Sequence, residues 1–149
     1  MSELNLSTNV VDAMHEAGWD YYPCGQCFKN SYYQCDDPYQ VAKDISDFTS
    51  YSVKSQDLSV DKGYWYVSLR TDAECLDFAK RYNEYCDARR RISKALFNGV
   101  LLLTKEQHDK IAEMAERYDK QFVGDQVMIA IPEDEFTRHV VFILDALGM

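Results

Sequence analysis

Apolar residues recur at three- and four-residue intervals in five stretches of the chain, and each stretch predicts an amphipathic helix. The predicted helices cover about residues 8–17, 38–48, 72–96, 105–122 and 133–147. In the second stretch, Val41, Ile45 and Phe48 form the stripe that faces the core. Polar N-cap residues such as Asp37 and C-terminal glycines such as Gly18 mark the predicted helix ends.

Other stretches change to alternation or to short apolar runs, which is typical of strands. The segment at about 51–70 predicts an antiparallel pair with a turn at Asp61-Lys62-Gly63. Two further strands are predicted at about 100–103 and 127–131. Because a predicted helix separates these two strands, we expect a right-handed crossover that makes them parallel.

The length of 149 residues is near the usual size of one domain, and no low-complexity or Gly/Pro-rich linker interrupts the chain. A hydrophobic content of 46% is ordinary for a packed globule. We therefore predict a single α+β domain over residues 1–149, in which a small mixed sheet packs against about five helices.

The formal net charge of −9 disfavours direct binding to nucleic acid, because phosphates are repelled at long range. It favours instead a protein partner with a basic surface. The segment MSELNLSTN lacks the basic and apolar parts of a secretory signal, and no apolar run approaches the roughly 20 residues needed to cross a bilayer. We expect a cytoplasmic protein without membrane contact.

Three of the five cysteines, Cys24, Cys27 and Cys35, fall in one short stretch. The spacing of Cys24 and Cys27 suits two ligands of a tetrahedral zinc ion, and Cys35 is the candidate third ligand. No residue at a diagnostic spacing supplies the fourth. Free cysteines that fill core space are the alternative explanation. A redox pair is less favoured, because its Cys-x-x-Cys would follow a strand of a βαβ unit.

Catalytic machinery is not visible in the sequence. The histidines His15, His108 and His139 are scattered, and there is no Walker loop, GxGxxG or GxSxG segment. Basic residues between 80 and 94 have the character of a phosphate-binding surface, but they point in several directions around the predicted helix, and two of them pair with Asp77 and Asp87 at i,i+4 spacing. We interpret them as a solvated helix face and expect a protein that is not an enzyme.

Tyrosine is concentrated toward the N-terminal end, where eight of the 11 tyrosines lie within the first 66 residues together with both tryptophans. Large aromatic rings are enriched in protein interfaces, although tyrosines also pack at strand and core margins. Acidic residues are interspersed with these rings. The predicted partner-binding surface consists of Trp19, Asp20, Tyr21, Tyr22, Tyr32, Tyr33, Asp36, Asp37, Asp44 and Asp47.

We therefore predict a non-enzymatic regulator or inhibitor that docks onto a protein through an acidic, tyrosine-rich surface. One form is an inhibitor of the kind that phages and plasmids direct against host defence, which blocks a basic or nucleic-acid-binding site by presenting carboxylates where phosphates bind. The alternative is a small zinc-binding domain, held by Cys24, Cys27 and Cys35, with a nucleic-acid-binding or enzymatic role. A third option is a small-molecule pocket between the strand at 64–70 and the long helix.

Overall fold

The computed structural model describes residues 6–23, 26–97 and 100–149. The chain divides into two compact units, Met1–Tyr85 (unit 1) and Cys86–Met149 (unit 2). Within the described residues, no helix combines the length and the apolar character that a bilayer-spanning segment requires.

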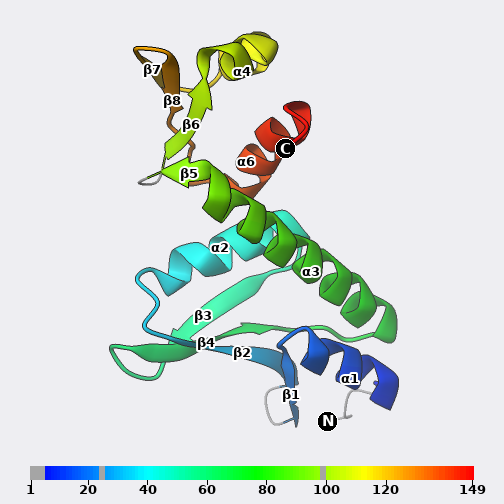
Figure 1. The fold of residues 1–149 in the computed structure, drawn as a ribbon. Coiled ribbons are helices and arrows are strands. Elements are labelled where there is room, and N and C mark those ends of the chain that lie inside the picture. Colours follow the sequence, from blue (N-terminus) through cyan, green and yellow to red (C-terminus); the bar gives the residue numbers. More distant parts are fainter. Residues whose placement is uncertain (1–5, 24–25, 98–99) are drawn as a thin grey trace. The chain divides into compact units, whose positions relative to one another are not determined.

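Unit 1 contains a four-stranded antiparallel sheet with the strand order β1-β2-β4-β3 (Figure 1). Its elements are α1 (Thr8–Glu16), β1 (Asp20–Tyr22), β2 (Cys27–Tyr33), α2 (Pro38–Thr49), β3 (Val53–Asp57) and β4 (Lys62–Val67). The long helix α3 (Asp72–Ala95) begins in unit 1 and ends in unit 2.

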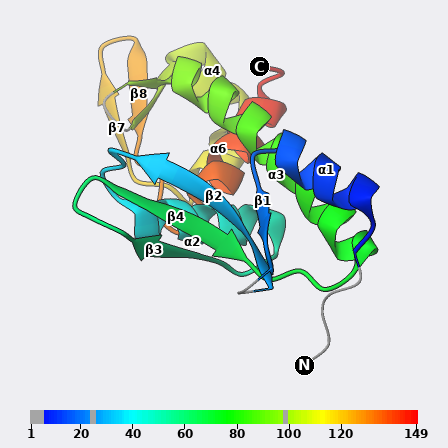
Figure 2. The same ribbon diagram turned by 90° about the horizontal axis from the view of Figure 1, so that it is seen from below.

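The two faces of this sheet differ because successive side chains of a strand point to opposite sides. Phe28 and Val67 are opposite each other in the register and are buried on the inner face. Helix α2 lies against that face, where the indole Nε1 of Trp65 donates to the carbonyl of Pro38 at 2.8 Å. Figure 2 looks onto the outer face, where no helix of unit 1 lies over β2 and β4.

The helix ends in unit 1 follow the local sequence. The hydroxyl of Ser7 accepts from the backbone of Val10 at the start of α1, and Gly18 after that helix has a φ of 98° that favours glycine. The carboxylate of Asp37 accepts from the backbone of Gln40 at 3.1 Å and caps α2. Asp37 and Gly18 mark these helix ends as the sequence predicts, which confirms the positions of both helices.

Unit 2 contains a second antiparallel sheet with the order β5-β6-β8-β7. Its elements are β5 (Leu96–Phe97), β6 (Val100–Thr104), α4 (Lys105–Lys110), α5 (Ala112–Ala115), β7 (Lys120–Val123), β8 (Gln126–Ile129) and α6 (Phe136–Ala146). Leu101, Ile129 and Ile143 are fully buried in its core. Thr104 and Gln107 form a capping box at the start of α4.

The α+β class and the antiparallel pair within 51–70 are confirmed, since β3 and β4 pair in that segment. The predicted parallel pairing is wrong, because Leu101 pairs with Ile129 in an antiparallel register. The mixed sheet is therefore replaced by two antiparallel sheets, one in each unit. The single domain over residues 1–149 stays a prediction.

Candidate protein-binding surface

Trp19 lies in the interior of unit 1 rather than on the predicted surface. Its side chain is 0% exposed, and its ring packs edge-on against Phe78 and Tyr82 with centroid distances of 5.1 and 5.3 Å. The residue is adjacent to Gly18, which turns the chain from α1 into β1 and directs the indole under α3. Trp19 is therefore a core residue, and its place in the predicted surface is corrected.

Tyr32 and Asp44 are also internal. Tyr32 is on the inner face of β2, and its hydroxyl donates to the carboxylate of Asp57. Burial and this carboxylate raise the pKa of Tyr32, so its phenol stays protonated. Asp44, on the buried side of α2, accepts from the hydroxyl of Tyr85 at 3.0 Å. Both residues therefore stabilise unit 1 internally and are removed from the predicted surface.

The β1 residues lie at the opposite end of β2 from its C-terminus. Asp20 is exposed and accepts from the ring of His15, which raises the pKa of that histidine. Tyr21 is half-buried, with its ring 5.2 Å from that of Phe28. Tyr22 is exposed on the outer face of the sheet. These three residues lie at the other end of the sheet from Asp36 and Asp37. Asp47 is half-buried in α2.

The exposed part of the predicted surface gathers at the end of unit 1 where β2 and β3 finish and β4 begins. Gln34 N–H donates to the carbonyl of Asp61 at 2.5 Å, and the hydroxyl of Tyr39 donates to Asp57 at 3.3 Å, which ties the β2–α2 connection and α2 to the β3–β4 turn. We call this end the acidic tip. It consists of Tyr33, Asp36, Asp37, Tyr39, Asp57, Leu58, Val60 and Asp61.

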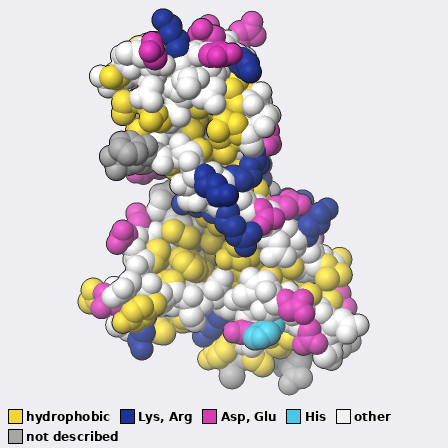
Figure 3. All heavy atoms as spheres, in the orientation of Figure 1, with side chains coloured by type: hydrophobic (Ala, Val, Ile, Leu, Met, Phe, Trp, Pro, Cys, Tyr) yellow, Lys and Arg dark blue, Asp and Glu magenta, His cyan; other side chains and the backbone are white. Residues whose placement is uncertain are grey.

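The acidic tip exposes large apolar side chains beside carboxylates. The exposed fractions are 72% for Tyr33, 58% for Tyr39, 62% for Leu58 and 100% for Val60. Figure 3 shows hydrophobic and acidic side chains together at this end of unit 1, on the left of the view. Apolar patches that are rimmed by polar groups are typical of interaction sites.

Sequence reasoning missed Tyr39, Asp57, Leu58, Val60 and Asp61 as members of this surface. Leu58 and Val60 precede the turn that the sequence predicts at 61–63, whereas in the structure they belong to the turn between β3 and β4. The polar residues around them, in the stretch DLSVDKG, were the available signal for a longer exposed turn.

The outer face of the sheet in unit 1 carries lysines beside aromatic rings. The ammonium of Lys29 lies 3.6 Å from the ring centroid of Tyr22 and 4.0 Å from that of Tyr64. By the register, Lys54 and Lys62 project from the same face. The ring of Tyr22 is therefore in contact with a base, and the exposed Asp20 lies on the same face, directly opposite Lys29.

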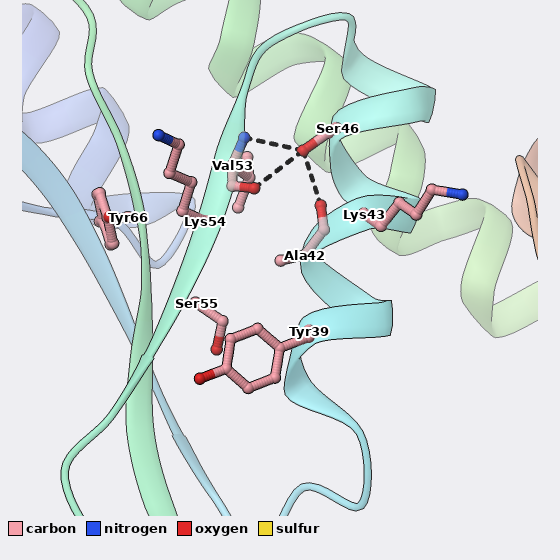
Figure 4. A pocket seen from close by; sticks show the side chains of 8 residues that line it. All are labelled: Tyr39, Ala42, Lys43, Ser46, Val53, Lys54, Ser55 and Tyr66. Atoms are coloured by element: carbon pink, nitrogen blue, oxygen red, sulfur yellow. Dashed lines mark hydrogen bonds between the residues drawn. The ribbon is translucent and has the colours of Figure 1, made fainter.

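A groove lies between α2 and the edge strand β3 and has a volume of about 440 Å³ (Figure 4). Tyr39, Ala42 and Lys43 line it from the helix, and Val53, Lys54 and Ser55 line it from the strand. This volume lies within the usual range of ligand pockets, roughly 300–1,000 Å³.

In the described part of the structure, the predicted zinc ligands Cys27 and Cys35 do not lie close together. Cys27 begins β2 and Cys35 follows its end, and at about 3.3 Å per residue the strand separates them by roughly 20 Å or more. One zinc ion, bound at about 2.3 Å from each sulfur, does not reach both. Cys24 lies outside the described residues, and among the residues that are described no group of three His, Cys, Asp or Glu could hold a metal ion.

Burial also acts against thiolate formation at two cysteines. It raises the pKa of Cys75 to about 11 and raises that of Cys27, where nearby Lys29 opposes the effect. Both thiols therefore stay protonated at neutral pH. Cys75 is fully buried in the core of unit 1, in agreement with the packing interpretation.

Three of the basic residues of α3, Arg81, Arg90 and Arg91, form ion pairs. Arg81 Nε donates to Asp77 at 3.1 Å, which confirms the predicted i,i+4 pair. Asp87 pairs with Arg90 rather than with Arg91, and Arg91 donates instead to Asp145 of α6 at 2.8 Å within unit 2. These pairs support the interpretation of a solvated, ion-paired helix face.

No family model, curated protein or solved structure matches this chain.

Proposed function

We propose that this protein is a non-enzymatic regulator or inhibitor that binds a partner protein through the acidic tip. The observation that carries the proposal is the exposure of Tyr33, Tyr39, Leu58 and Val60 beside four carboxylates at one end of unit 1. The partner presents a basic surface, such as a nucleic-acid-binding cleft, and the carboxylates occupy positions where phosphates would bind.

The tip has the two components that such an interface needs. Exposed aromatic and aliphatic side chains supply apolar area that is buried on binding, and carboxylates around them steer the encounter with a basic partner. Asp57 is held in place by the hydroxyls of Tyr32 and Tyr39, so that its charge is fixed before the partner arrives. A preorganised group costs less ordering entropy on binding.

The test is affinity capture of partners from the native host lysate with the full chain as bait. The charge variant is Asp36→Asn with Asp61→Asn, and the apolar variant is Tyr33→Ser with Val60→Ser. The matched control is Asp12→Asn with Glu16→Gln, which removes the same charge from exposed positions of α1. We expect the wild type and the control to capture the same protein, and both tip variants to lose it.

The captured protein is then purified and titrated with the bait at increasing salt. Binding weakens as the salt concentration rises if the carboxylates act as proposed, because salt screens exposed charges. A nucleic acid ligand of the partner should compete with the bait. Capture that persists in both tip variants contradicts the proposed surface, and affinity that is indifferent to salt contradicts the charge mimicry.

A further inference from the structure

The free edge of β3 exposes backbone hydrogen-bonding groups in a defined alternation. In an antiparallel pair of strands, every second residue forms both of its backbone hydrogen bonds with the residue opposite it. The N–H and C=O groups of the residues between them point away from that partner strand. The N–H of Leu58 donates inward to the carbonyl of Lys62, which places the even-numbered residues toward β4. Val53, Ser55 and Asp57 therefore direct their peptide groups away from the sheet.

Val53 confirms this alternation and shows how the edge is satisfied at that point. The hydroxyl of Ser46, on α2, accepts from the N–H of Val53 at 2.8 Å, and its single proton is shared between the carbonyls of Ala42, at 2.8 Å, and Val53, at 3.1 Å. Ser46 thus takes the place that a residue of a neighbouring strand would occupy (Figure 4). Two residues further along the strand, the peptide groups of Ser55 have no such partner among the residues that the structure describes.

Ser55 lines the groove between α2 and β3. The residues that line this groove include two lysines and no acidic residue. Lys43 on the helix and Lys54 on the strand both line the groove and are exposed. Figure 4 shows both side chains pointing away from the space between α2 and β3, with the ammonium group of Lys54 beyond the strand and that of Lys43 beyond the helix. Tyr39 and Ala42 give the helix wall its apolar part. These lysines favour an anionic chain as the occupant of the groove.

We propose that an extended acidic peptide binds this groove by adding an antiparallel strand to the edge of β3. The residue opposite Ser55 exchanges both peptide hydrogen bonds with it and turns its side chain toward α2, because directly opposite residues share a face. That side chain is aliphatic and contacts Ala42 and Tyr39. The adjacent peptide residue projects on the other face, where a carboxylate pairs with Lys54. This site goes beyond the proposed function and shares one residue, Tyr39, with the acidic tip.

The first experiment measures binding of short fluorescent peptides of alternating glutamate and valine to the wild-type chain by polarisation. One peptide carries N-methyl groups on its valines and another carries them on its glutamates. We expect the first to lose binding, because valine N–H groups donate to the edge of β3. The second should bind about as well as the unmethylated peptide, since its glutamate N–H groups point to solvent. A lysine–valine peptide should not bind.

The second experiment uses variants of the full chain. Ser55→Pro removes the outward N–H and is tolerated at a strand edge, so its thermal stability should stay close to that of the wild type while peptide binding is lost. Lys54→Glu should weaken binding of the acidic peptide by about tenfold or more, a difference of roughly 1.4 kcal/mol. Lys80→Glu, at an exposed position of α3 outside the groove, is the charge-matched control and should leave binding unchanged.

Several outcomes would overturn the proposal. Equal binding of the two methylated peptides would exclude strand addition, even if the proline variant failed to fold. Absence of wild-type binding at peptide concentrations up to about 1 mM would exclude the acidic peptide as the occupant. A concentration-dependent dimer in light scattering that Ser55→Pro abolishes would assign the edge to a second copy of this chain instead.

Discussion

Gly63 is the residue at which the sheet of unit 1 tolerates no side chain. A Cβ at this position would overlap the carbonyl oxygen of Gln56 and the phenol of Tyr32. We expect Gly63→Ala to lower the free energy of unfolding by about 1–3 kcal/mol, as for other overpacked interiors. Urea denaturation measures this change.

The control for Gly63→Ala is Ser31→Ala, because Ser31 is exposed on the outer face opposite Tyr64. Its effect should stay within about 0.5 kcal/mol. If the two variants had equal stability, the close packing of Tyr32 on Gly63 would not hold in solution.

His15 provides a pH-dependent contact at the surface. Its hydrogen bond with Asp20 raises the pKa of the imidazole above the ordinary value of 6.5. Because the pKa in the folded state is the higher one, the stabilisation is fully present below pH 6.5 and is lost as the pH rises through the folded-state pKa. In an NMR titration, Asp20→Asn should move the His15 midpoint back toward 6.5, whereas Asp12→Asn should change it much less.

At the residue scale, the sequence predicts which residue types matter but not which of them face inward. Trp19 and Tyr32 were assigned to a surface because aromatic residues serve both interfaces and cores. The deciding facts are the alternation along β2 and the turn at Gly18, and both depend on strand pairing. The three polar residues Lys29 to Ser31 conceal that alternation, since Asn30 faces inward and donates to Tyr82 at 3.1 Å.

At the element scale, Asp37 has two roles that substitutions can separate. It caps α2 and contributes a carboxylate to the acidic tip. Asp37→Ala should destabilise the protein by about 1 kcal/mol, whereas Asp37→Asn should keep most of the cap because an amide oxygen also accepts the bond. Thermal unfolding of both variants checks this expectation.

For partner binding, Asp37→Asn should still reduce affinity, because it removes a charge from the tip without removing the cap. A loss of affinity in Asp37→Ala alone would indicate that the cap, and not the charge, maintains the surface.

The predicted helices at 8–17, 38–48 and 72–96 agree closely with α1, α2 and α3, because caps and periodicity are local signals. The predicted helix at 105–122 instead divides into α4, α5 and β7. Gly124 follows the end of this predicted helix, but its φ of 60° belongs to the two-residue turn of a hairpin in which Val123 pairs with Gln126. The Gly124-Asp125 pair, which lies between the apolar runs Phe122-Val123 and Val127-Ile131, is the sequence signal for this hairpin.

At the scale of the whole molecule, the net charge of −9 predicts weak interaction with nucleic acid. We expect no shift of duplex DNA in a gel at physiological ionic strength, since phosphates meet a repulsive field before any local contact forms. A salt-sensitive complex would contradict this expectation, and loss of that complex in Lys29→Glu would assign it to the outer face of the sheet.

The arrangement of two sheets in two units was beyond what the sequence could predict. Strand order depends on pairings between segments that are distant in the chain, and β5 and β7 are too short to stand out from their neighbours. The right-handed crossover rule applied to 100–103 and 127–131 was wrong because β7 forms a hairpin with β8, which brings β8 beside β6 in the antiparallel sense.

The course of α3 constrains how the gene could be divided for expression. Tyr85 and Cys86 are consecutive residues inside this helix, yet they belong to different units. Cys75 and Phe78 are buried in the first unit, and Ile92 is buried in the core of the second. A truncation at the unit boundary would leave helical carbonyls without their i+4 donors on one fragment and amides without acceptors on the other. Fragments that each retain residues 72–95 would avoid this loss, at the cost of duplicating the helix.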